Sequence, residues 1–154
     1  MLSVFKCHLS TPCYRQPNQS NKEYIVQRRN YFNKTLKNKT TIFRNVPTKL
    51  VYSNLPGNKC FNKFAYGKEE FHIRKDGKKP RIDRHRLERL DWIFEIIDNI
   101  KKCKNCNKYH ILNDKNHHDR INIFCEQNNY KVVISLKKTN DCYLILTAFY
   151  TKIK

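Results

Sequence analysis

The sequence predicts an α+β domain in which one long amphipathic helix precedes a three- or four-stranded antiparallel sheet. Two patterns support this prediction. Residues 81–99 pass from a run of arginines into an apolar stripe with helical spacing, and apolar residues alternate with polar ones after residue 120. Short turns separate the last strands, so neighbouring strands should be antiparallel. A basic segment, helical or irregular, is expected to precede this domain.

The predicted helix begins after Asp83, whose carboxylate can cap the free backbone N–H groups of a first turn. It should end near Lys101, because a cation is favourable at the C-terminal end of the helix dipole. One face of this helix is expected to be buried, and it consists of Leu87, Leu90, Ile93, Phe94, Ile97 and Ile100.

Four segments are predicted to be strands, namely 109–112, 120–126, 130–136 and 142–150. Alternation in the second segment places Ile121, Ile123 and Cys125 on one face and Arg120 on the other. The last segment is almost entirely apolar, which predicts a central strand covered on both faces. Weaker patterns indicate strands at 49–53 and 70–74 and a basic helix at 23–37.

The charge is strongly positive, with 32 Lys+Arg against 13 Asp+Glu and a net charge of +19. Glu23 is the single acid in residues 1–68. Such an excess indicates a polyanionic partner, above all nucleic acid. An AT-rich genome is the alternative explanation for many lysines, but it explains the arginines of 81–89 poorly. We expect residues 1–45 to form a basic, partly disordered arm and residues 46–154 to form the folded domain.

Several classes of protein are disfavoured. No apolar run approaches the length of a membrane span, which predicts no membrane partner. The odd number of cysteines, seven, favours reduced thiols and a cytoplasmic location. An organelle-targeting segment within the acid-poor residues 1–45 is the alternative. Nucleotide-binding and metalloprotease motifs are missing, and the acids are not grouped as in a two-metal nuclease, so no cofactor is expected.

The second half of the chain resembles a known family. The arginine-rich lead into ERLDWIFEIIDN and the later segments YKVVISL and YLILTAFY resemble the phage-associated barnase/EndoU/colicin/RelE-like (BECR-fold) nucleases over residues 78–152. This resemblance implies a metal-independent ribonuclease fold, toxin-like RNA cleavage and a sheet that holds RNA on its concave face. It also implies an immunity or antitoxin protein as a partner. It does not fix the catalytic residues.

Metal-free RNA cleavage needs a proton carrier near neutral pH and cations that stabilise the phosphorane. His85 lies between two arginines at the predicted helix start, where backbone N–H groups also favour an anion. The candidate catalytic residues are His85, Arg84, Arg120, Thr147 and Tyr150. The candidate nucleic-acid contacts are Lys78, Lys79, Arg81, Arg86, Arg89 and Lys131. Phe149 or Tyr150 is expected to stack on a base.

Each candidate also has an ordinary structural explanation. His85 can be a solvated histidine in a basic run, and Thr147 suits any strand. The arginines at 84 and 89 can pair with Glu88 and Asp91 on the helix surface. We predict no metal site. The alternative is a zinc site built from Cys103, Cys106, His110 and His117, whose histidine spacing is irregular.

The predicted function is therefore a metal-independent endoribonuclease that cleaves RNA, such as tRNA or mRNA, by attack of the 2′-hydroxyl. Two alternatives remain open at this point. One is a noncatalytic RNA- or DNA-binding protein that uses the same basic surface. The other is a small zinc-stabilised organellar or ribosome-associated protein.

Overall fold

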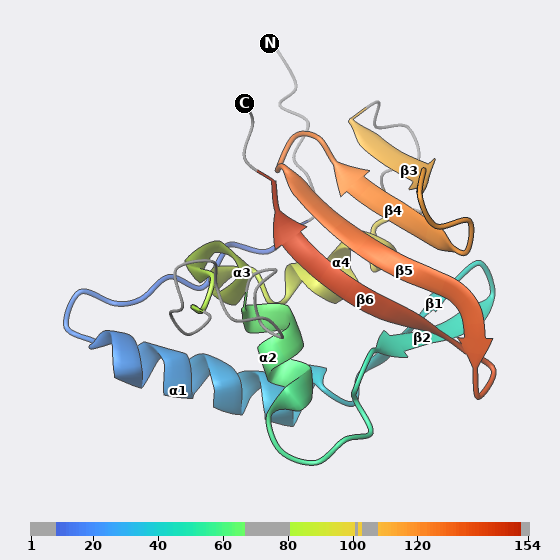
Figure 1. The fold of residues 1–154 in the computed structure, drawn as a ribbon. Coiled ribbons are helices and arrows are strands. Elements are labelled where there is room, and N and C mark those ends of the chain that lie inside the picture. Colours follow the sequence, from blue (N-terminus) through green and yellow to red (C-terminus); the bar gives the residue numbers. More distant parts are fainter. Residues whose placement is uncertain (1–8, 67–80, 101, 103–107, 152–154) are drawn as a thin grey trace, which may run out of the picture.

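A computed structural model describes residues 9–66, 81–100, 102 and 108–151. These residues form an α+β fold with one six-stranded sheet (Figure 1). The elements are α1 (Asn21–Tyr31), a π-helical turn (Phe32–Leu36), β1 (Thr40–Phe43), β2 (Val46–Leu50), α2 (Lys59–Ala65), α3 (Arg84–Glu88), α4 (Trp92–Asp98), β3 (Tyr109–Asn113), β4 (Arg120–Cys125), β5 (Tyr130–Thr139) and β6 (Cys142–Tyr150). In Figure 1, α4 lies behind the sheet, and no helix lies in front of β4, β5 and β6.

The sheet is larger than predicted and is mixed. Its strand order is β1-β2-β6-β5-β4-β3, and β2 runs parallel to β6 while every other pair is antiparallel. The prediction of a purely antiparallel sheet with three or four strands is therefore wrong. The extra strands form a hairpin whose two-residue turn, Arg44 and Asn45, has positive φ angles of 51° and 65°. Such turns usually contain glycine, so this one leaves a weak signal in the sequence.

The prediction of a single long helix is also wrong, because α3 and α4 are separated by a turn at residues 89–91. The N-cap prediction holds, since Asp83 Oδ1 accepts hydrogen bonds from the backbone N–H groups of His85 and Arg86. The break has a long-range cause. Two carbonyl oxygens of α3 accept hydrogen bonds from the N-terminal region instead of from the next helical turn. Arg28 Nε donates to Leu87 O at 3.1 Å, and the Cys13 N–H donates to Glu88 O at 2.8 Å. Those carbonyl oxygens would otherwise accept the next helical hydrogen bonds.

Loss of the Asp83 cap should destabilise the protein measurably. Asp83→Ala leaves the first backbone N–H groups of α3 without their acceptor, which costs about 1 kcal/mol of unfolding free energy. Urea denaturation followed by circular dichroism measures the difference. Asp83→Asn retains a capping oxygen and should stay close to wild type. Equal losses for the alanine and asparagine variants would show that the cap is not the source of the effect.

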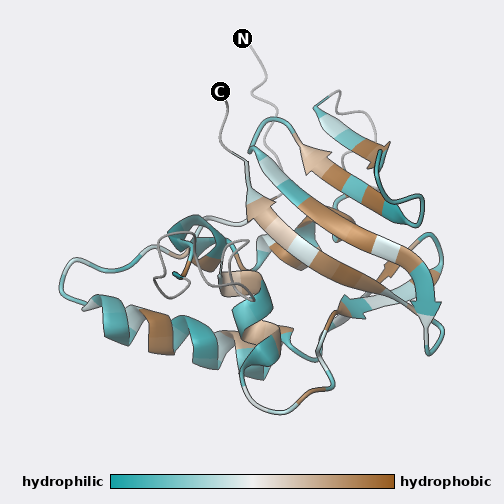
Figure 2. Cartoon of the chain, viewed as in Figure 1, coloured by the Kyte–Doolittle hydropathy of each residue, from teal (hydrophilic) through white to brown (hydrophobic). Residues whose placement is uncertain are grey.

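The alternation predicted for the strands is found. Ile121, Ile123 and Cys125 of β4 are buried, and so are the alternate positions of β5, Tyr130, Val132 and Ile134. Figure 2 shows the same alternation as changes of colour along these strands. The strand β6 is central in the sheet, but most of its side chains are only half-buried.

The N-terminal region belongs to the same core. Tyr24, Phe32 and Leu36 are buried with the residues of α4 and the sheet. The helix predicted at 23–37 is present as α1 and the π-helical turn. The domain boundary expected at residue 45 falls inside the turn between β1 and β2. The helix α2 had no counterpart among the predicted elements, and the strand expected at 70–74 lies outside the described residues.

Acids of α4 and the preceding turn attach the N-terminal region to the core. Asp91 accepts a hydrogen bond from the Tyr31 hydroxyl, and Glu95 accepts one from Ser10 Oγ at 2.8 Å. Burial, together with the bond to Asp91, raises the pKa of Tyr31 to about 12. Asp91 and Glu95 thus attach distant segments of the chain to this part of the core.

Candidate nucleic-acid interface

Four side chains form a row across the sheet on the face opposite the buried core. His110 pairs with Phe124, Phe124 with Lys131, and Lys131 with Phe149, so β3, β4, β5 and β6 each contribute one residue. Phe124 lies between the buried Ile123 and Cys125, so its ring is on the other side of β4. We call this side of the sheet the outer face, and we call His110, Phe124, Lys131 and Phe149 the stacking row.

The members of the stacking row contact one another. The rings of His110 and Phe124 are stacked with centroids 6.3 Å apart, and Lys131 Nζ lies 5.8 Å from the centroid of Phe149. All four side chains are half-buried. Each aromatic ring therefore retains exposed surface that a flat ligand can cover.

The outer face is cationic. None of the six strands contains an aspartate or glutamate. Lys49 and Arg120 lie on the same face as the stacking row, because the pairings Lys49–Leu144, Leu144–Ser135 and Ser135–Arg120 connect them across the sheet. The acid nearest the row is Glu126, which follows β4 and binds His110 at 3.0 Å. This hydrogen bond, with the charge of Lys108, holds the pKa of Glu126 below its ordinary value.

Helix α3 extends this surface along the edge of β6. Strand β2 pairs with β6 only along residues 143–145, and α3 lies beside the remainder of β6. Arg86 Nη1 donates to Thr147 Oγ1 at 3.1 Å, and the Arg86 guanidinium lies 5.4 Å from the centroid of Phe149. A largely buried arginine thus connects α3 to the end of the stacking row.

A second contact group surrounds His85. Its ring stacks on Tyr150 with centroids 4.8 Å apart, and Nδ1 lies 3.4 Å from Arg89 Nη1. The Arg89 guanidinium also lies over the rings of Tyr150 and Trp92, at 4.7 and 5.2 Å. His85 keeps 45% of its side chain exposed, whereas Arg89 keeps 11%. Of this group, the imidazole of His85 is the part most open to a ligand.

Glu88 offsets much of the charge of this group. Its Oε1 lies 3.1 Å from Arg89 Nη1 and 3.9 Å from His85 Nδ1. The pairing of Arg89 with an acid, proposed as its ordinary structural role, is therefore present, although the partner is the adjacent residue. We call His85, Arg89 and Tyr150 the edge cluster, which is separate from the contacts of Arg86 with Thr147 and Phe149.

The structure brings the candidate residues together in two groups. His85, Arg89 and Tyr150 form the edge cluster. Arg86 and Lys131 both contact the Phe149 ring, and Arg86 also binds Thr147 on the outer face.

Other candidates lie elsewhere. Arg84 turns toward α1, where Nη2 donates to Asn21 Oδ1 at 2.7 Å. Arg120 pairs with Ser135, and Tyr150 pairs with Tyr130, five positions away along β5. Arg120 is therefore separated by about 16 Å along the strands from Tyr150, on which His85 stacks. The expected clamp of Arg84 and Arg120 around a phosphate at His85 is therefore not formed in this structure. Arg81 is exposed before α3.

Some candidates lie outside the described residues, namely Lys78, Lys79, Cys103 and Cys106. Of the histidines proposed for zinc, His110 binds Glu126, and the backbone N–H of His117 donates to Asp114 Oδ1 at 3.1 Å. Among the residues that the structure describes, no three His, Cys, Asp or Glu side chains are grouped to hold a metal ion. The helices of that part of the chain are also too short and polar to cross a bilayer.

Two members of the stacking row, His110 and Phe124, were not identified from the sequence as nucleic-acid contacts, and His110 was named only in the alternative zinc site. Phe124 had a usable signal, because alternation in β4 places it on the same face as Arg120. His110 had none, since its position depends on how β3 aligns with β4.

No family model matches this chain, and comparisons with curated proteins and with solved structures find no match. The resemblance to ribonucleases therefore stays an expectation from the sequence. The fold and surface define an α+β protein whose strands contain no acids and whose sheet carries aromatic rings and cations on one face.

Proposed function

We propose that this protein binds single-stranded RNA across the outer face of its sheet. The observation that supports this most strongly is the stacking row, in which three aromatic side chains and one lysine lie side by side across four neighbouring strands. Unpaired bases stack on exposed aromatic rings, and lysines beside those rings neutralise the phosphates that connect the bases. The choice of RNA over DNA rests on the resemblance of residues 78–152 to ribonucleases.

The aromatic rings of the stacking row should be necessary for affinity. The double variant Phe124→Ala/Phe149→Ala removes two stacking surfaces, each contributing about 1–3 kcal/mol. Fluorescence anisotropy with a labelled single-stranded oligoribonucleotide should show binding weakened by at least about tenfold. The dependence of affinity on salt should not change, because no charge is removed.

Tyr14→Ala is the matched control, because Tyr14 is a 51% exposed aromatic residue outside the sheet. It should bind like the wild type. A double variant that also binds like the wild type would contradict stacking on this face.

Lys131 should contribute through charge alone. Lys131→Gln removes one phosphate contact, so the slope of log K against log salt should become shallower by about 0.7. A salt titration of the same anisotropy signal measures this slope. Lys115→Gln removes an equal charge from an exposed loop and should leave the slope unchanged. Identical slopes for the wild type and Lys131→Gln would place the RNA elsewhere.

A second candidate function is cleavage of the bound RNA by His85. The observation that favours it is a half-exposed imidazole that stacks on Tyr150, the residue after Phe149 in β6, and lies next to Arg89. Attack by the 2′-hydroxyl needs a group that accepts a proton, and an imidazole does so near neutral pH. Cleavage should then proceed in excess EDTA and leave 2′,3′-cyclic phosphate ends.

A further inference from the structure

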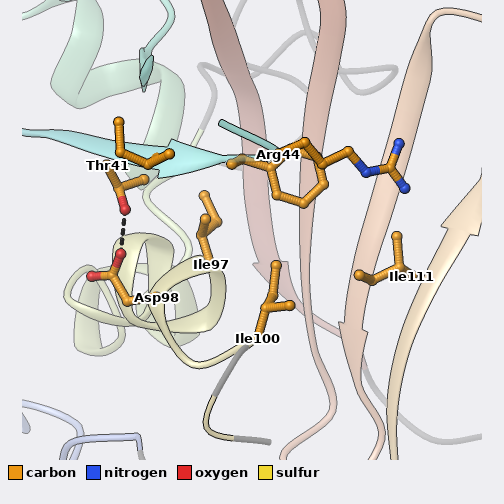
Figure 3. Close-up of a pocket in the computed structure, with 8 residues that line it drawn as sticks. Thr41, Arg44, Ile97, Asp98, Ile100 and Ile111 are labelled. Atoms are coloured by element: carbon orange, nitrogen blue, oxygen red, sulfur yellow. Dashed lines mark hydrogen bonds between the residues drawn. The ribbon is translucent and has the colours of Figure 1, made fainter. Parts of the chain in front are cut away.

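A cavity of about 620 Å³ lies at the C-terminal end of α4, away from the stacking row and the edge cluster. Figure 3 shows that its walls come from β1, α4 and β3. The lining residues are Thr41, Ile42, Phe43, Arg44, Ile97, Asp98, Ile100 and Ile111. Four isoleucines and a phenylalanine make most of this lining apolar.

The cavity exists because the sheet curls. Strands β1 and β3 are the two ends of the strand order, yet both line this one cavity. Four large hydrophobic side chains are exposed in the described part of the chain, and two of them, Ile42 and Ile111, line this cavity. Exposed apolar side chains beside a cavity typically mark a binding site.

The polar groups of the cavity are few and mostly engaged. The Thr41 hydroxyl donates to the Asp98 carboxylate, so these two groups satisfy each other within the wall (Figure 3). Arg44 is exposed, and its guanidinium contacts the Phe43 ring at 5.1 Å without a carboxylate partner among the described residues. In Figure 3 its side chain extends from the end of β1 toward Ile111. Among the described residues that line it, the cavity therefore has a largely apolar interior and one available cation, Arg44.

We propose that this cavity binds an aliphatic carboxylate, with the carboxylate on Arg44 and the hydrocarbon chain against Ile97, Ile100 and Ile111. Arginine pairs well with carboxylates, and the volume lies within the range of small-molecule sites. A nucleobase fits less well, because the groups that would recognise its polar edges are engaged with each other. A second copy of this chain would bring two net charges of +19 together.

Isothermal titration calorimetry with sodium decanoate tests this proposal. The wild type should bind decanoate with one-to-one stoichiometry. Decan-1-ol, which lacks the carboxylate, should bind more weakly, and butyrate, which lacks most of the chain, should not bind measurably. This binding does not depend on RNA, so a failure of RNA binding would leave the proposal intact.

Two variants test separately how the carboxylate and the hydrocarbon chain of the ligand contribute to binding. Arg44→Gln should weaken decanoate binding about tenfold or more and leave decan-1-ol binding unchanged, because only a charge-assisted contact is lost. Ile111→Ser, at a position that is 40% exposed, should weaken both ligands while the protein stays folded. Lys138→Gln is the charge-matched control on an exposed strand end, and it should bind decanoate like the wild type.

Three results would overturn the proposal. The first is the absence of saturable one-to-one decanoate binding. The second is equal decanoate affinity for Arg44→Gln and Lys138→Gln. The third is a dimer in sedimentation velocity that Ile42→Asp dissociates, because a second copy would then cover the cavity.

Discussion

Phe94→Ala is expected to lower the free energy of unfolding by about 3–5 kcal/mol. Phe94 is completely buried in α4, at the centre of the core shared by the N-terminal helix and the sheet. Removing its ring loses burial and leaves a cavity that the surrounding side chains cannot fill. Because whole domains are stable by only about 5–15 kcal/mol, this loss is a large part of the total.

Urea denaturation followed by the fluorescence of Trp92 measures this effect. Trp92 is the single tryptophan, and its ring packs edge-on against Tyr130 at 5.3 Å, so it reports on contact between α4 and the sheet. Tyr14→Ala, at an exposed position, should change stability by less than about 0.5 kcal/mol. A Phe94→Ala variant as stable as wild type would mean that α4 is not packed as described.

His85→Ala is expected to lower the rate of RNA cleavage by about 10²–10⁴-fold if the edge cluster is catalytic. Affinity for RNA should change little, because the stacking row and its cations stay intact. Incubation of labelled RNA in excess EDTA, with analysis of the product ends, measures the rate and identifies the cyclic phosphate. Tyr150→Phe keeps the ring that stacks on His85 and tests whether the hydroxyl takes part.

His117→Ala is the matched control, because His117 is exposed in the loop between β3 and β4. It should cleave like the wild type. Normal cleavage by His85→Ala would remove His85 from catalysis. A wild-type protein that binds RNA without cutting it would leave binding alone as the function.

Local patterns predicted the strands β3 to β6 and the faces on which their side chains lie. Alternation was sufficient for Ile121 and Ile123, because only one side of the sheet is packed against helices. The break between α3 and α4 left no local signal. It depends on Arg28 and Cys13, which occupy carbonyl oxygens far away in the sequence.

The candidate site was predictable only in part, because local patterns indicate side-chain type and face but not the alignment of distant segments. His85, Thr147 and Tyr150 were named from charge, chemistry and strand pattern. The structure stacks His85 on Tyr150, whereas Thr147 binds Arg86 on the outer face. Arg120 was placed on the correct face. Its separation from His85 depends on the register of β4 and β5, which a single sequence does not reveal.

Competition between single-stranded RNA and a duplex of the same length tests RNA binding on the outer face most directly. Bases in a duplex are stacked on one another and cannot cover Phe124 or Phe149. At moderate salt, the wild type should prefer the single strand, and Phe124→Ala/Phe149→Ala should lose that preference while Tyr14→Ala keeps it. Equal affinity of the wild type for both forms would contradict the account, because only the phosphate charge would then be recognised.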